Sequence, residues 1–299
     1  MGLIKPVERD LDYVYIIRTD TTIFKLFQKP LGSKWIVTEI KQSTVTANRS
    51  TIGLSNVFVG DLATVEPKSN YTLENSIELV TSGAWEYAFN TADGWIGMSH
   101  GNDLRQFGEW LLDGSPTDIL GTTSNTVFKA KKINRVEIGD LLNPLDDTDV
   151  VGTVWREHTI TNENIIVEIK IEWLAEVTIN FGYVAMCPYN RGANATSKGR
   201  YIDDDVIQDI STDTFTKRNK DTYGVLMRND NNQLTSRLEI LNPKEALLNY
   251  EYNGSEKTYI SNSELYNKFY PSVVGSEDYI TSIGEEWNIK FRFEAYMPE

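Results

Sequence analysis

The sequence is poor in the residue types around which many sites are built. Its 299 residues include one cysteine and two histidines. A single cysteine excludes an intramolecular disulfide and a Cys-x-x-Cys zinc site. Cys187 follows an apolar run, 184–186. We therefore predict that it is a small buried side chain and not a catalytic thiol.

Long apolar runs and several common catalytic motifs are also absent. No stretch approaches the roughly 18 consecutive apolar residues of a membrane-spanning helix, and the first residues lack an apolar signal core. We therefore expect a protein made in a cytoplasm, with no signal peptide and no membrane insertion. Glycine-rich phosphate loops, His-Glu-x-x-His zinc sites and Gly-x-Ser-x-Gly elbows do not occur. Their absence excludes the usual nucleotide-dependent enzymes, zinc proteases and α/β-hydrolases.

Positive charge is scarce as well. Asp and Glu number 43 against 29 Lys and Arg, which gives a formal net charge of −14. A field of this sign repels phosphate backbones and anionic lipid head groups, so we predict no nucleic-acid partner and no membrane-surface role. An anionic glycan would bind only where a local basic patch offsets the net charge.

Short alternating runs are what the sequence has in abundance. In 167–173 and again in 289–296, apolar residues alternate with polar and charged ones. This period of two predicts strands with one buried and one solvated face, so the odd-numbered residues of 167–173 should point into the core. Further strands are predicted at Tyr13–Arg18, Ile23–Phe27, Trp35–Ile40, Ser76–Val80, Ala84–Phe89, Thr126–Lys131, Thr178–Met186, Tyr223–Met227 and Leu234–Leu241. Asn253-Gly254 predicts a hairpin turn.

These runs predict an all-β fold, an antiparallel β-sandwich or jelly-roll-like domain with few short helices. Asp103–Leu112 and Ser263–Phe269 are the segments whose composition allows a helical turn or two. The length suits one large domain, with or without a small extension. Residues 1–65 are expected to form a small N-terminal β segment or the first strands of the sandwich, and residues 66–299 the large domain.

Both histidines lie in unusual settings. His100 is in the glycine-rich stretch 93–103, His158 comes shortly before the strand at 167–173, and Tyr183 lies near the end of the following strand. A cleft that joined them with Arg156 would have the groups for β-elimination on a uronic acid. Arg156 would neutralise the carboxylate, and tyrosine or histidine would move the proton. The alternative is that His158 is a partly buried strand residue and that His100 caps a loop.

Aromatic residues gather near the histidines, and aromatic rings are the surfaces on which sugars stack their C–H faces. The residues are Trp85, Tyr87, Trp95, Trp110 and Trp155. Core packing is the favoured interpretation for most of them. Trp95 is the exception, because Gly94 and Gly97 flank it in a loop. We predict that Trp95, Asn102 and Asp103 bind a ligand.

Two acidic clusters complete the candidate sites. Asp146–Asp149 and Asp203–Asp205 place carboxylates in loop-like settings, and calcium favours such oxygen ligands. Neither cluster has EF-hand spacing, so a solvated acidic turn is the favoured interpretation and calcium the alternative. No other cofactor is expected.

The stretch 85–190 resembles bacteriophage tail-associated proteins that bind or degrade host-surface glycans. The resemblance lies in His100-Gly101-Asn102-Asp103, Leu112-Asp113-Gly114, His158-Thr159-Ile160, Ile169–Leu174 and Gly182–Met186. It implies a jelly-roll-like domain, a virion setting with other virion proteins as partners, and a homo-oligomer such as a trimer. Residues 1–65 would then serve virion attachment. Where members of this group carry an acidic residue directly after the His-Gly pair, this chain has Asn102 and then Asp103.

Three functions follow from these observations. The first is a phage virion protein that recognises a host-surface polysaccharide. The alternative is a polysaccharide lyase or hydrolase acting on an anionic glycan, and the second alternative is a purely structural virion component. Convergence of His100, His158, Tyr183 and Arg156 in one groove would favour the enzyme.

Overall fold

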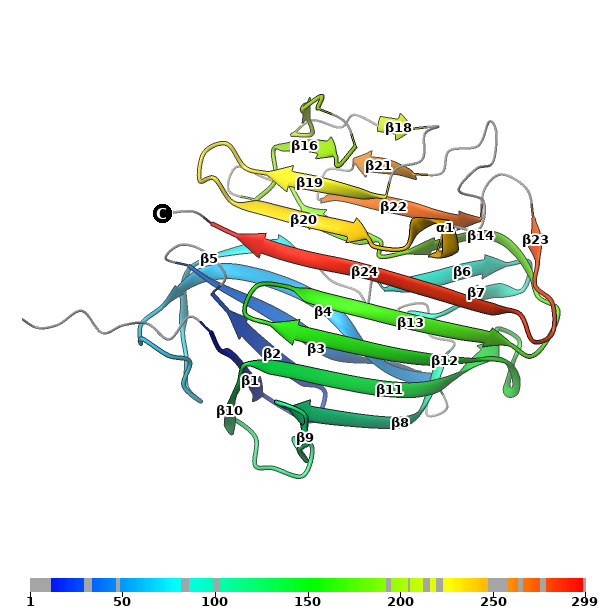
Figure 1. Ribbon diagram of the computed structural model, residues 1–299, viewed down its shortest axis with the longest axis horizontal. Coiled ribbons are helices and arrows are strands. Elements are labelled where there is room, and N and C mark those ends of the chain that lie inside the picture. The colour runs from blue at the N-terminus through cyan, green and yellow to red at the C-terminus, as the bar shows by residue number, and fades with distance from the viewer. Residues whose placement is uncertain are drawn as a thin grey trace, which may run out of the picture.

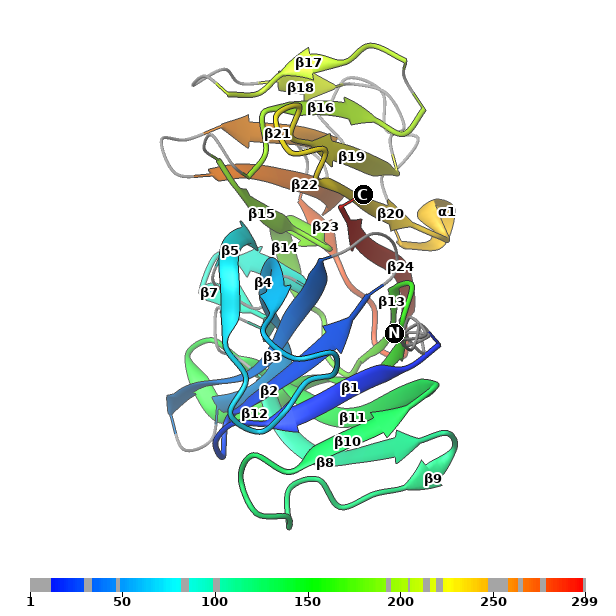
Figure 2. The ribbon, with the colours of Figure 1, turned by 90° about the vertical axis from the view of Figure 1, so that its left-hand side faces the viewer.

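The computed structural model shows two stacked, strongly twisted β-sheets (Figures 1 and 2). It describes residues 12–29, 34–46, 49–81, 86–98, 103–191, 195–203, 205–211, 216–218, 223–246, 258–262, 266–274 and 278–297. We call the layer nearer the viewer in Figure 1 the front sheet and the other layer the back sheet. The pairing between strands is antiparallel almost throughout, so the predicted all-β sandwich is confirmed.

The front sheet carries the longest strands of the molecule. In spatial order they are β9 (Ser115–Pro116), β8 (Asp103–Leu112), β11 (Lys132–Asn143), β12 (Asp146–Thr161), β13 (Ile165–Trp173), β24 (Glu286–Tyr296), β20 (Thr235–Ile240), β19 (Gly224–Arg228), β16 (Lys198–Tyr201) and β17 (Gln208–Asp209). A short helix, α1 (Pro243–Ala246), follows β20 and lies beside β24.

The back sheet begins with the N-terminal strands. Its spatial order is β10 (Val127–Ala130), β1 (Val14–Arg18), β2 (Ile23–Gln28), β3 (Trp35–Thr46), β4 (Arg49–Leu62), β5 (Leu73–Val80), β15 (Cys187–Asn190), β22 (Tyr266–Val274), β21 (Thr258–Asn262) and β18 (Thr216–Arg218). At β22 a smaller sheet branches off, formed by β14 (Thr178–Val184), β6 (Tyr87–Thr91), β7 (Gly94–Ile96) and β23 (Tyr279–Ile280).

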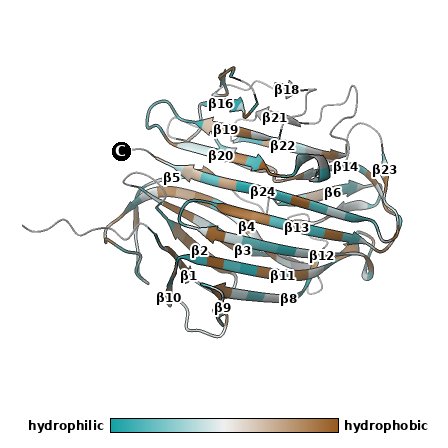
Figure 3. Cartoon of the chain, in the orientation of Figure 1, coloured by the Kyte–Doolittle hydropathy of each residue, from teal (hydrophilic) through white to brown (hydrophobic). Residues whose placement is uncertain are grey.

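One large hydrophobic core fills the space between the layers. In β13, Val167, Ile169, Ile171 and Trp173 are at most 1% exposed and belong to this core. The residues between them point outward, as the burial pattern of β13 shows, so the predicted faces of this strand are confirmed. Alternating brown and teal bands run along β11, β12, β13 and β24 in Figure 3. The outer face of the front sheet is therefore polar and open to solvent.

The N-terminal strands belong to this same architecture. β1 pairs with β10 and β4 with β5, so strands from 12–62 are joined on both sides to strands from later in the chain. Val14, Ile16 and Phe24 are fully buried in the shared core. The boundary at residue 65 falls in the connection between β4 and β5, which lie side by side.

The two segments predicted to hold a helical turn are strands where the structure describes them. Asp103–Leu112 is the strand β8 and not a helical turn, because nine of its residues pair with β11 and so satisfy their backbone groups in the sheet. The second helical candidate overlaps β22 from Tyr266 on, and its first residues lie outside the described ones. The predicted hairpin at 253–254 also lies outside the described residues.

Within the ranges that the structure describes, no helix is long and apolar enough to cross a bilayer.

Candidate functional site

Strand β12 places a charged and a polar side chain among the apolar ones on its interior face. Its alternation sends Arg156 and His158 into the interior, where they are 1% and 0% exposed. Trp155 therefore lies on the solvent face and is only half-buried. Core packing, the interpretation favoured for most of the aromatic residues in this region, holds for Tyr87 and Trp110 but not for Trp155. Departures from the usual burial of apolar side chains concentrate at functional sites, so the surroundings of β12 form the candidate site.

Trp155 stands in a groove of about 370 Å³ on the outer face of the front sheet. The groove crosses β12, β13 and β24, which pair continuously and lie at the centre of this sheet in Figure 1. Its walls are Ile138, Thr153, Val154, Trp155, Lys170, Ile171, Glu172, Glu286, Trp287 and Asn288. A concave surface with an aromatic ring and several converging polar groups is typical of ligand sites.

The ring of Trp155 is held in place by a neighbouring cation. The Nζ atom of Lys170 lies 4.7 Å from the centre of a Trp155 ring, and Lys170 is the direct partner of Trp155 across β12 and β13. Such a cation–π contact fixes the orientation of an exposed ring at a gain of about 0.5–1 kcal/mol. The exposed side chain of Ile138, 42% accessible, adds an apolar wall on the neighbouring strand.

Polar groups from two strands face the tryptophan. Glu172 and Glu286 are directly opposite each other on β13 and β24, and Lys170 is opposite Asn288. Both glutamates are exposed. Their carboxylates accept hydrogen bonds, and the amide of Asn288 both donates and accepts. The groove thus combines a stacking face with groups suited to hydroxyls.

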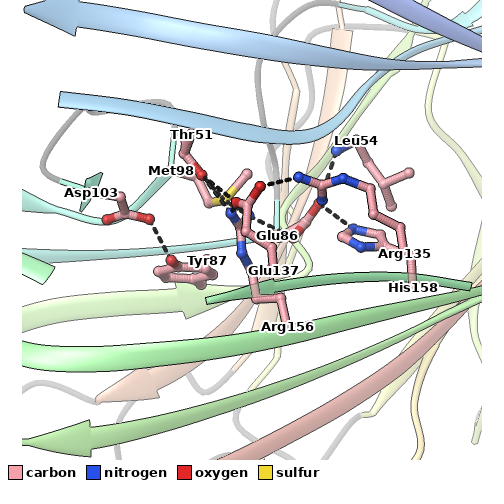
Figure 4. Close-up of polar contacts among 10 residues, drawn as sticks. All are labelled: Thr51, Leu54, Glu86, Tyr87, Met98, Asp103, Arg135, Glu137, Arg156 and His158. Carbon is pink, nitrogen blue, oxygen red and sulfur yellow. Dashed lines mark hydrogen bonds and ion pairs between the residues drawn. The ribbon is translucent and has the colours of Figure 1, made fainter. Parts of the chain in front are cut away.

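Beneath the groove, a network of charged side chains is buried between the two sheets (Figure 4). Glu86, 0% exposed, is at one end of it. Its Oε1 atom accepts hydrogen bonds from the backbone N–H of Leu54 at 2.8 Å and from Nε2 of His158 at 2.9 Å. Its Oε2 atom lies 3.3 Å from Nη1 of Arg156. One carboxylate therefore connects the back sheet to β12.

The other half of the network lies on β11. Glu137 forms ion pairs with Arg156 and with Arg135, and it accepts a hydrogen bond from Thr51 at 3.2 Å. Both arginines and Glu137 are 1% exposed. Two guanidinium groups against two carboxylates leave these four residues without net charge. Buried charges are tolerated only when they are compensated in this way.

His158 is neutral within this network. Burial, together with the nearby charges of Arg135 and Arg156, lowers the pKa of His158 despite the presence of Glu86. Burial raises the pKa of Glu86 too, but His158 and Arg156 together lower the pKa of this carboxyl to about 2. The neutral imidazole therefore donates its Nε2–H to an ionised Glu86. Nδ1 of His158 has no hydrogen-bond partner among the described residues.

Asp103 lies near the network but is bound to a different partner. Its Oδ2 atom accepts a hydrogen bond from the hydroxyl of Tyr87, and the residue is 2% exposed. Burial raises the pKa of the Asp103 carboxyl to about 6. The ring of Tyr87 in turn lies 6.0 Å from the guanidinium carbon of Arg156. Asp103 is therefore an interior residue and not an exposed ligand-binding group.

The predicted site residues fall into separate places. Arg156 and His158 lie together in the buried network, whereas Tyr183 packs with Trp95 at a ring-centre distance of 6.0 Å. That pair lies on the face of the β6–β14 sheet opposite to Tyr87, because Tyr183 pairs with Ala88 and neighbouring residues alternate. The structure thus does not bring Tyr183 to Arg156 and His158. His100 and Asn102 lie outside the described residues.

Sequence reasoning missed Glu86, Arg135 and Glu137. For the last two a signal was present: in 133–141, Arg135 and Glu137 occupy the same phase as the apolar Ile133 and Leu141. A charge in the apolar phase of a strand indicates a buried, compensated group. Glu86 carries no such signal, because it lies just before β6 and contacts β12 only through the fold.

The turn predicted at 146–149 is wrong, because these residues begin strand β12 and the turn lies just before them, at 144–145. Oδ1 of Asp146 accepts hydrogen bonds from the backbone N–H and hydroxyl of Thr148, at 2.9 and 2.7 Å. Among the described residues, no three His, Cys, Asp or Glu side chains are grouped to hold a metal ion. Cys187 is buried, as predicted.

The site thus belongs to an antiparallel β-sandwich. Comparison with known proteins does not narrow this class to a family. No protein-family model matches the chain, and no curated protein is similar to it in sequence. A putative aldose 1-epimerase from Escherichia coli K12 is similar in structure, with a TM-score of 0.42 and 8% identity over 92% of this chain and 99% of that one.

Two further solved structures are similar to a comparable degree. The Slr1438 protein of Synechocystis has a TM-score of 0.43 and 7% identity over 94% of this chain and 97% of that one. A mutant of the heparan sulfate lyase HepC from Pedobacter heparinus has a TM-score of 0.33 and 10% identity, over 88% of this chain and 35% of that one. At these identities and TM-scores the likeness carries no argument about function.

Proposed function

We propose that this protein binds a polysaccharide in the groove around Trp155. The observation that carries the proposal is a half-buried tryptophan on the solvent face of a sheet, in a groove of about 370 Å³ with Glu172, Glu286 and Asn288. A flat ring suits the apolar face of a sugar, and the polar groups around it suit hydroxyls. Two of the similar structures are named for enzymes that act on sugars, which agrees with the proposal but does not carry it.

Retention on immobilised bacterial surface polysaccharides tests this function. Trp155→Ala should weaken retention about tenfold or more, because an aromatic anchor at the centre of a site contributes roughly 2 kcal/mol. Trp95→Ala is the matched control and also tests the predicted Trp95 site, since Trp95 lies on a different sheet. Retention that depends on Trp95 and not on Trp155 would move the binding site to the β7 region.

Cleavage of the bound polysaccharide is the second candidate function, and one observation favours it. Glu172 and Glu286 are opposite each other on the groove floor, and glycoside hydrolysis uses two carboxyl groups that flank the scissile bond. Arg156 and His158 do not serve here, because they are buried beneath the sheet. New reducing ends, lost in Glu286→Gln with retention intact, would establish hydrolysis. Unsaturated products would instead indicate a lyase.

The setting of the protein stays a prediction. The similar structures give no support to a phage tail protein, so the host-surface glycan, the virion partners and the trimer rest on the sequence resemblance alone. A calcium ion at the acidic clusters stays a prediction as well.

A further inference from the structure

A second hollow, of about 240 Å³, lies on the same outer face of the front sheet as the Trp155 groove. It crosses β16, β19 and β20 and reaches the last residue of β24. Its walls are Lys198, Gly199, Arg200, Ile207, Leu226, Arg228, Thr235 and Tyr296. Three of these side chains are cations and none is an acid, although acidic residues outnumber basic ones 43 to 29 in the chain.

The cations are brought together by strand register. Lys198 is directly opposite Arg228 on β16 and β19, and Arg200 follows two residues after Lys198 on the same face. Like charges placed opposite each other in a sheet are destabilising. An anion bound between them would offset that repulsion.

Each of the three cations contacts a carboxylate at the rim of the hollow. Lys198 contacts Asp209 at 2.8 Å, Arg228 contacts Asp230 at 2.7 Å, and Arg200 contacts Asp205 at 3.9 Å. The side chains of all three aspartates are exposed, and none of them lines the hollow. Exposed ion pairs contribute at most about 1 kcal/mol. A ligand oxyanion in the hollow therefore competes with weak partners.

The remaining walls are apolar or aromatic. Ile207 is 55% exposed and Leu226 lies on β19 between the cations. Tyr296 contributes a half-buried ring at the end of β24. Low-polarity walls strengthen the attraction between a cation and an anion compared with open water. The ring also offers a stacking face like that of Trp155.

Strand β24 connects the two hollows. Asn288 lines the Trp155 groove and Tyr296 lines the second hollow, and both point to the outer face because they are eight residues apart. At about 3.3 Å per residue the two positions are roughly 26 Å apart along the strand. An extended chain lying along β24 would reach both.

We propose that the Lys198–Arg200–Arg228 hollow binds an oxyanion, a carboxylate or a sulfate ester, carried by the polysaccharide in the Trp155 groove. This inference rests on the proposed function and names its ligand class, an acidic polysaccharide. The net charge of −14 repels such a polymer elsewhere on the surface. Screening limits that repulsion to about 8–10 Å at ordinary salt, so the local cations decide where the polymer binds.

Affinity electrophoresis in gels that contain dextran, carboxymethyl dextran or dextran sulfate tests the inference with one polymer backbone. The wild-type protein should be retarded more by a charged derivative than by dextran, and the two derivatives show which oxyanion is preferred. Lys198→Gln combined with Arg228→Gln should weaken this charge-dependent binding about tenfold, because charge-assisted hydrogen bonds are lost. Lys131→Gln with Lys132→Gln removes the same charge from exposed positions elsewhere and should leave it unchanged.

Each outcome bears on one proposal. Equal retardation of the wild type by all three polymers, or a Lys198/Arg228 variant that behaves like the wild type, would overturn the inference. Neither result touches the proposed function, which is judged from Trp155→Ala on bacterial polysaccharides. Thermal melting of the variants confirms that they fold, since substitutions at exposed sites seldom change stability by more than about 0.5 kcal/mol.

Discussion

Arg156 is the residue that links the two carboxylates of the buried network, Glu86 and Glu137. Arg156→Leu would leave both carboxylates without this cation, and breaking a buried pair costs about 3–5 kcal/mol. Urea unfolding should show a loss of this size in the free energy of unfolding. Arg237→Leu is the matched control, because Arg237 pairs with Glu239 at 34% side-chain exposure and its loss should cost at most about 1 kcal/mol. Equal losses in the two variants would show that the network is not compensated as described.

Asp103 makes the stability of the folded protein depend on pH. Its pKa is raised from 3.8 to about 6 by burial, so between these values the unfolded chain binds fewer protons than the folded protein. The wild type therefore loses stability as the pH rises through this window, by about 3 kcal/mol for a shift of roughly two units.

Asp103→Asn removes this titration, while the amide oxygen can still accept the hydrogen bond from the Tyr87 hydroxyl. As the pH rises from about 4 to 7, the free energy of unfolding of the variant should increase relative to that of the wild type. Urea unfolding of both proteins at several pH values measures the difference. A difference that stays constant with pH would mean that Asp103 is ionised throughout.

At the scale of the strand, β13 allows a test in which one residue type is placed on both faces. Ile169 is 0% exposed, whereas Ile166 is only half-buried on the outer face. Ile169→Asp should cost several kcal/mol by burying an unpaired charge, and Ile166→Asp should cost roughly 1 kcal/mol or less. Melting temperatures measure both. Similar losses in the two variants would contradict the register of the sheet.

How much the sequence predicts also differs from strand to strand. β13 is predictable because its odd positions are all apolar, so one face is fixed. β12 is not, because its interior positions include Arg156 and His158, whose burial is compensated by Glu86 from far along the chain. The outward position of Trp155, and hence the groove, follows from that compensation. No local pattern around 155 contains this information.

β8 shows a different limit of sequence reasoning. Phe107 and Trp110, its apolar residues in 107–110, are three positions apart in the sequence, so no alternation with a period of two marks this strand. Pairing with β11 decides the structure of this segment. The second hollow is also not predictable from the sequence, because Lys198 and Arg228 meet only when β16 pairs with β19. Long-range pairing is what short sequence windows lack.

At the scale of the whole molecule, the N-terminal strands are expected to unfold together with the rest. Strands β1 to β4 complete the back sheet and contribute Val14, Phe24 and Leu54 to the common core. Deletion of residues 1–65 should therefore abolish cooperative thermal unfolding of the remaining chain, and the full chain should show one calorimetric transition. A truncated protein with a sharp transition of its own would make residues 1–65 a separate domain.

Because Cys187 is buried, modification of its thiol is a probe of local opening of the fold. The thiol is 0% exposed on β15, opposite Phe269 of β22, and burial raises its pKa well above the usual range. Because the chain has no other cysteine, a thiol-specific reagent modifies one site only, and only in molecules in which Cys187 has become exposed. The rate of modification at increasing reagent concentration therefore reports how often the back sheet opens around Cys187 under native conditions.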